Sequence, residues 1–179
     1  MSSSSTNKSP MLIDRPLHSF ATVGGTAALT TATDFNTPNG AGCVLLVNCS
    51  SNDGAVIDSI SVMINRSSTT TTSVLVFIST ATSTSTISTA NTACVANVAI
   101  PAGTTVGQRL NVSLPPLSVP VPNLASPAAT TVGYPSETDK KNTGLYVPSS
   151  ALVYVGTASQ ITSPSADTRV NVFAQGGFF

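Results

Sequence analysis

The sequence predicts an all-β protein: an antiparallel two-sheet sandwich of about eight strands, with a jelly-roll topology and an extended N-terminal arm. Apolar residues recur at a period of two along much of the 179-residue chain, and no long stretch keeps a helical period. The 26 Ser and 26 Thr residues suit strands and turns better than helix interiors. A jelly roll is favoured because it typically arranges eight strands in two sheets.

The length suits one domain, and we expect an arm over residues 1–18 followed by a single β-sandwich domain over residues 19–179. The arm holds an apolar cluster flanked by Pro10 and Pro16. Burial of such side chains on a partner would contribute about 1.5 to 3 kcal/mol each. An alternative is that the arm is a flexible leader or a strap on its own domain. The predicted partner-binding residues are Met11, Leu12, Ile13, Arg15 and Leu17.

Four strands are predicted in the first half of the chain. The first has two glycines that indicate a bulge or bend, and the second and fourth are apolar on both faces. The third places Ile60, Val62 and Ile64 on one face, while Ile57 and Met63 interrupt its polar face, which indicates contact with a neighbour. These strands are expected over Phe20–Thr33, Cys43–Asn48, Val56–Asn65 and Ser73–Ser79.

The second half begins with a low-complexity stretch, residues 79–92 (STATSTSTISTANT), which is expected to be an exposed loop or a weak edge strand. Residues 115–135 hold six of the twelve prolines, so we expect an extended crossover there rather than a central strand. Residues 137–142 (ETDKKN) are expected to form a loop tip. The remaining strands are expected over Cys94–Ile100, Gln108–Leu114, Leu152–Val155 and Thr168–Gln175.

Charge and hydropathy exclude several classes of protein. Lys plus Arg equals Asp plus Glu at 7 each, and only Lys140 and Lys141 are adjacent cations, so the basic cluster of a nucleic-acid-binding protein is missing. No apolar run reaches the roughly 18 residues of a membrane span. The first ten residues, MSSSSTNKSP, have no apolar segment of the signal-peptide kind. We therefore expect a protein made and assembled in a cytoplasm, with no membrane or nucleic-acid partner.

Residues that could carry chemistry are few and scattered. Cys43, Cys49 and Cys94 are odd in number and lack metal-site spacing, which indicates small buried residues. The single histidine, His18, lies at the end of the arm, and the seven carboxylates are dispersed among turn and loop signals. No phosphate-binding loop, dinucleotide fingerprint or zinc-protease motif is present. We expect no enzyme activity, no cofactor and no metal.

The chain resembles small β-sandwich virion proteins of tailed bacteriophages, most of all capsid decoration (cement) proteins. The resemblance lies in the low charge, the Ser/Thr/Ala/Val-rich composition, the N-terminal arm and the closing strand over residues 169–177 (RVNVFAQGG). It implies a homotrimer on the outer capsid surface whose arms clamp adjacent copies of the major capsid protein. It carries no residue-level site to this sequence.

Two other functional classes stay open. One is a different virion part, such as a phage tail, baseplate or receptor-binding module. The other is a cellular adhesin or carbohydrate-binding domain, for which the chain has few aromatic residues, with no Trp and three Tyr. In every class, the low charge favours association with copies of itself.

Overall fold

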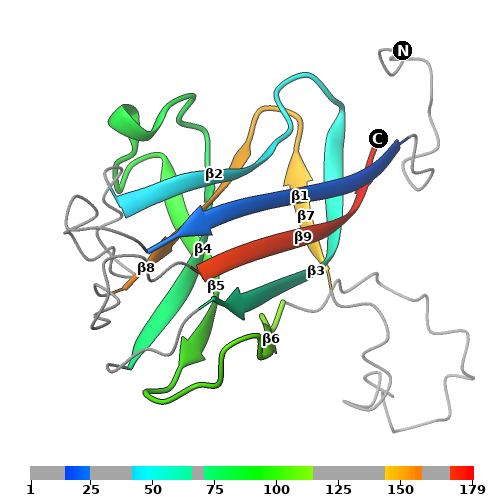
Figure 1. Cartoon of the computed structure of the whole chain (residues 1–179). Coiled ribbons are helices and arrows are strands. Elements are labelled where there is room, and N and C mark those ends of the chain that lie inside the picture. Colours follow the sequence, from blue (N-terminus) through cyan, green and yellow to red (C-terminus); the bar gives the residue numbers. More distant parts are fainter. Residues whose placement is uncertain (1–14, 25–41, 66–70, 115–143, 159–169) are drawn as a thin grey trace, which may run out of the picture.

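The computed structural model describes residues 15–24, 42–65, 71–114, 144–158 and 170–179. These residues form nine strands and one short 3₁₀ turn, η2 (Figure 1). The expected all-β sandwich is confirmed. The elements are β1 (Arg15–Val23), β2 (Cys43–Asn48), β3 (Gly54–Ile64), β4 (Thr72–Ser79), η2 (Thr84–Thr86), β5 (Thr92–Ile100), β6 (Arg109–Asn111), β7 (Leu145–Pro148), β8 (Leu152–Thr157) and β9 (Val170–Phe178).

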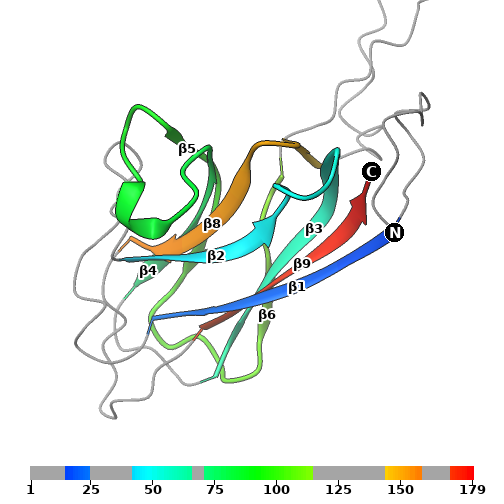
Figure 2. The same cartoon turned by 90° about the horizontal axis from the view of Figure 1, so that it is seen from above.

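The strands are divided between two antiparallel sheets that pack against each other (Figure 2). One sheet has the order β1-β9-β3-β6, with β7 also paired to β3, and the other has the order β2-β8-β4-β5. The pairs are nested: β1 with β9, β2 with β8, β3 with β6 and β4 with β5. This nesting is the topology of a jelly roll, in which one long antiparallel hairpin is folded over into two sheets. Strand β7, which pairs with β3, is an additional strand outside these four nested pairs.

Strand β3 shows how the apolar pattern determines the buried face. Ile60, Val62 and Ile64 are buried, as their spacing predicts. Ile57 is also fully buried, although it is out of phase with them. The cause is a β-bulge between Ile57 and Ser59, which adds Asp58 and shifts the alternation by one residue. The expectation that Ile57 interrupts an outward-facing polar surface is therefore wrong.

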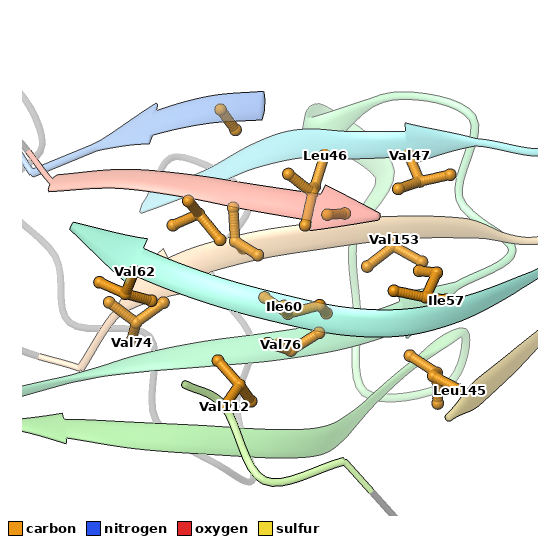
Figure 3. Close-up of a cluster of buried hydrophobic side chains, with 14 of the residues drawn as sticks. Leu46, Val47, Ile57, Ile60, Val62, Val74, Val76, Val112, Leu145 and Val153 are labelled. Atoms are coloured by element: carbon orange, nitrogen blue, oxygen red, sulfur yellow. The ribbon is translucent and has the colours of Figure 1, made fainter. Parts of the chain in front are cut away.

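The core between the sheets consists of aliphatic side chains from both layers (Figure 3). Val62 and Ile60 of β3 face Val74 and Val76 of β4, while Val153 of β8 lies beside Ile57. All six side chains are at most 1% exposed. At about 1.5 to 3 kcal/mol for each fully buried side chain, this layer is the main source of stability.

A second, smaller apolar cluster lies on the other face of the β2-β8-β4-β5 sheet. It consists of Cys43, Leu75, Phe77, Leu152 and Tyr154, each at most 5% exposed. This cluster explains why β4 has apolar residues on both faces. Val74 and Val76 lie in the main core, while Leu75 and Phe77 lie in the second cluster. Burial on both faces is confirmed for β4.

The cluster is covered by residues 80–91, here named the cap loop. The Tyr154 hydroxyl donates a buried hydrogen bond of 2.9 Å to the carbonyl oxygen of Ala81, and the Ile87 side chain packs against the cluster. The Asn91 amide nitrogen donates to the Thr86 carbonyl oxygen at 2.9 Å, and its side-chain oxygen accepts from the Ser88 N–H at 2.9 Å. Most residues of the cap loop are exposed, as expected, while the loop also covers the cluster through contacts at Ala81 and Ile87.

Other expectations are corrected at strand ends. Strand β2 has the predicted bounds, but Leu45 is 39% exposed, so the expected burial on both faces is wrong there. The first strand starts at Arg15 and ends at Val23, earlier than predicted, because Gly24 takes a φ of 69° and ends the extended conformation. The predicted strand over Gln108–Leu114 shortens to β6, and β7 was not predicted. Residues 25–33, the crossover at 115–135 and the loop tip at 137–142 lie outside the described residues.

Tyr154→Phe is expected to lower the free energy of unfolding by about 1 kcal/mol, because it removes one buried hydrogen bond and leaves the Ala81 carbonyl unpaired. Tyr146→Phe is the matched control, since Tyr146 is 51% exposed, and should change stability by less than about 0.5 kcal/mol. Urea unfolding measures both values, and amide exchange should show faster opening of the cap loop in Tyr154→Phe. Equal effects of the two variants would contradict this account of the cap.

Candidate interaction surface

The structure changes the boundary between the predicted arm and the sandwich. Residues 15–18 belong to β1, so the expected division after residue 18 is wrong. Leu17 is 1% exposed and lies in the main core, where it cannot dock on a partner. The predicted partner-binding residues Met11, Leu12 and Ile13 lie outside the described residues.

Arg15, the fifth predicted partner-binding residue, is exposed but engaged at the start of β1. Its guanidinium donates a hydrogen bond to the side-chain oxygen of Asn52 and lies 5.6 Å from the centre of the Phe178 ring. The strand register sets Arg15 opposite Phe178. Arg15 therefore links the start of β1 to β9 and to the turn before β3. These contacts lie at the end of the sandwich where the C-terminus is located (Figure 1).

The outer face of the β1-β9-β3-β6 sheet carries the most exposed large apolar side chain in the part of the chain that the structure describes. Phe20 is 71% exposed, and its ring lies 6.5 Å from that of Phe173, which is directly opposite on β9. Tyr146 of β7, 51% exposed, forms a second ring contact of 6.2 Å with Phe179. We name this surface, defined by Phe20, Phe173 and Tyr146, the aromatic face.

Polar side chains beside Phe20 and Phe173 are hydrogen-bonded to one another. The Thr22 hydroxyl donates to the side-chain oxygen of Asn171 at 3.1 Å, and the Asn171 amide nitrogen donates to the side-chain oxygen of Asn65 at 3.3 Å. Ser61, opposite Phe173 on β3, is 1% exposed, and its hydroxyl has no hydrogen-bond partner. The surface around Phe173 therefore provides apolar contact area rather than a strong hydrogen-bonding group for a partner.

The residues considered for chemistry do not converge. His18 is exposed on β1, Asp58 is exposed at the β3 bulge, and Asp53 lies in the turn before β3. Within residues 15–24, 42–65, 71–114, 144–158 and 170–179, no group of three or more His, Cys, Asp or Glu side chains could hold a metal ion. The same residues contain no helix of the length and apolar character needed to span a bilayer.

The three cysteines are free thiols, and Cys43 and Cys49 are buried, as expected. Cys94 is only half-buried. Burial raises the pKa of Cys43 and of Cys49 from 9.0 to about 11, because a thiolate is poorly solvated there. The thiolate is the reactive form, so these two side chains are inert at neutral pH.

Comparison with known proteins finds no matching family model, no similar curated protein and no similar solved structure. The fold and the aromatic face are therefore interpreted from the physical properties of this chain.

Leu17→Ala should lower the free energy of unfolding by about 2 to 5 kcal/mol, because the residue is part of the core rather than of a detachable arm. His18→Ala, at the adjacent exposed position, should change it by less than about 0.5 kcal/mol. Denaturant unfolding of both variants measures the difference. If the Leu17→Ala protein were as stable as wild type, the result would instead support the division after residue 18 that the sequence predicts.

Proposed function

We propose that this protein is a non-catalytic structural component of a virion, a capsid decoration (cement) protein that binds and stabilises the major capsid shell. The observation that carries the proposal is the aromatic face. A phenylalanine that is 71% exposed, paired with a second ring on the outer face of a sheet, is costly to leave in water. Such a surface is typical of a site that is covered by another protein.

The fold supports the same function. Jelly rolls are used by viral capsid domains and by lectins, so the topology is compatible with a virion protein, although a fold alone does not determine a function. A rigid sandwich also suits a cement protein, because the strands hold the contact residues in fixed positions. Phe20 and Phe173 are held opposite each other by the β1–β9 register.

The arm provides a second contact in this proposal. Met11, Leu12 and Ile13 lie shortly before β1 in the sequence, and β1 begins at the end of the sandwich where β9 ends and the C-terminus lies (Figure 1). An arm attached there can engage a neighbouring subunit while the sandwich stays folded. Linked contacts of this kind gain affinity over either contact alone, roughly 10²- to 10⁴-fold. Association into a homotrimer, which the resemblance implies, would multiply the number of arms.

Two alternatives use the same surface. A tail, baseplate or receptor-binding module of a virion would also dock through exposed aromatic residues, but at few copies per particle. A cellular adhesin or carbohydrate-binding domain would place Phe20 against a sugar ring, near the amides of Asn171 and Gln175, which flank Phe173 on the neighbouring strand β9. Copy number and location separate these alternatives.

We expect the protein to co-purify with virus particles from its source culture at hundreds of copies per particle, because a cement protein covers repeated sites on the shell. Quantitative mass spectrometry against the major capsid protein measures this number. A handful of copies would assign the protein to the tail or baseplate instead. Absence from purified particles, with the protein present in the lysate, would overturn the virion function.

Phe20→Ser should weaken binding to particles stripped of this protein by about 10- to 100-fold, equivalent to the roughly 1.5 to 3 kcal/mol of burying one phenylalanine. Leu45→Ser, at a 39% exposed apolar position on the other sheet, is the control and should leave binding within twofold. Both variants should unfold within a few degrees of wild type. Undiminished binding by Phe20→Ser would remove the aromatic face from the contact.

A further inference from the structure

The outer face of the β1-β9-β3-β6 sheet becomes polar on the side of β6. Strand β6 pairs with β3 so that Asn111 is opposite Ser61 and Arg109 is opposite Met63. Leu110, between the two polar residues of β6, packs against the main core, so its neighbours Arg109 and Asn111 point to the outer face. Three hydrogen-bond donors therefore lie side by side there, and we name Ser61, Arg109 and Asn111 the donor patch.

The donors of this patch have no acceptor of their own. The Ser61 hydroxyl is buried without a hydrogen-bond partner. Over the part of the chain that the structure describes, the side chains of Arg109 and Asn111 form no hydrogen bond, and Arg109 forms no ion pair. Asp58, the described carboxylate on β3, is exposed at the bulge and is not bonded to Arg109. Because a buried hydroxyl without a partner destabilises the free chain, Ser61 points to an acceptor supplied from outside.

Apolar side chains of the aromatic face adjoin the donor patch. Phe173 is directly opposite Ser61 on β9, and the 71% exposed Phe20 is opposite Phe173 on β1. Met63 is half-buried beside Arg109. Aromatic residues, Met and Arg are enriched in protein–protein interfaces, and Arg is frequent among the residues that dominate binding energy. A partner that covers the two phenylalanines would therefore reach the donor patch as well.

We propose that the donor patch binds a carboxylate side chain, Asp or Glu, of the protein that covers the aromatic face. An ionised carboxylate only accepts hydrogen bonds, so it complements one guanidinium, one amide and one hydroxyl. The Arg109 guanidinium supplies the charge and the bidentate geometry. The Ser61 hydroxyl becomes accessible through side-chain shifts on docking, which are common at interfaces. The inference rests on the proposed function, which makes the partner the major capsid protein.

A carboxylate suits this patch better than the phosphates of a nucleic acid. Affinity for nucleic acids comes from several clustered cations. Arg109 is the one Lys or Arg side chain beside the patch among the described residues, since Arg15 is engaged with Asn52 near the C-terminus. One guanidinium with two neutral donors matches a single side-chain anion.

Binding of the full chain to particles stripped of this protein tests the role of Arg109. Arg109→Glu should weaken binding at least about 100-fold, because it sets a like charge against the partner carboxylate. Arg109→Lys keeps the charge without the bidentate geometry and should weaken binding by about 3- to 10-fold. Thr89→Glu combined with Ala90→Glu makes the same change in net charge at exposed positions of the cap loop, and this control should bind within twofold of wild type.

Ser61→Ala separates a binding role from a structural one. The substitution removes a hydroxyl that has no partner in the free chain, so stability in urea should not fall. Binding to stripped particles should nevertheless weaken by about 10-fold, because a hydrogen bond to a charged group is lost in the complex. Undiminished binding by either Arg109→Glu or Ser61→Ala would overturn the proposal.

Carbodiimide coupling identifies the partner group directly, because it joins a lysine amine to a carboxylate in contact with it. The Arg109→Lys protein bound to particles should become linked through position 109 to an Asp or Glu of the major capsid protein, as mass spectrometry of the linked peptides detects. No link at position 109, or links only to carboxylates of this same chain, would overturn the proposal and leave the proposed function in place. Absence of wild-type binding to particles would overturn both.

Discussion

The structure depends on the insertion of the last strand, β9, between the first strand and β3. This contact joins the ends of the chain, and it places Val170, Val172 and Ala174 in the core. Gly176 makes the contact possible at its tightest point, because a Cβ there would collide with the Val56 carbonyl oxygen. With β9 in place the remaining pairs are nested inside it, so the jelly-roll topology follows from this one long-range pairing.

Burial on both faces of its two central strands, β8 and β4, distinguishes the β2-β8-β4-β5 sheet from its partner. The main core covers one face, and the cap loop covers the apolar cluster around Tyr154 on the other. A Ser/Thr-rich segment can do this because its short side chains satisfy backbone groups locally, as Ser79 does for the Ala81 N–H at 3.0 Å. Low sequence complexity is therefore compatible with a fixed conformation in residues 80–91.

The sandwich has two chemically different sides. One sheet carries the aromatic face and three of the four charged residues that the structure describes, and the fourth, Asp53, lies in the turn before β3; the other sheet is uncharged.

The sequence by itself determined the fold class, the bounds of β2 and the buried face of β3 from Ile60 to Ile64, because alternation of apolar residues is a local property. It also indicated that Cys43 and Cys49 are buried. Only the tertiary structure decided that Leu17 belongs to the core, since an apolar residue next to a proline has the same local pattern in an arm and in a strand.

The bulge at Asp58 and the opposition of Phe20 and Phe173 were likewise decided by tertiary structure. A bulge arises from the register between two strands, and β3 and β9 are separated in the sequence by more than 100 residues. The aromatic face could not be predicted for the same reason: its two phenylalanines lie near opposite ends of the chain, and only the pairing of β1 with β9 brings them together.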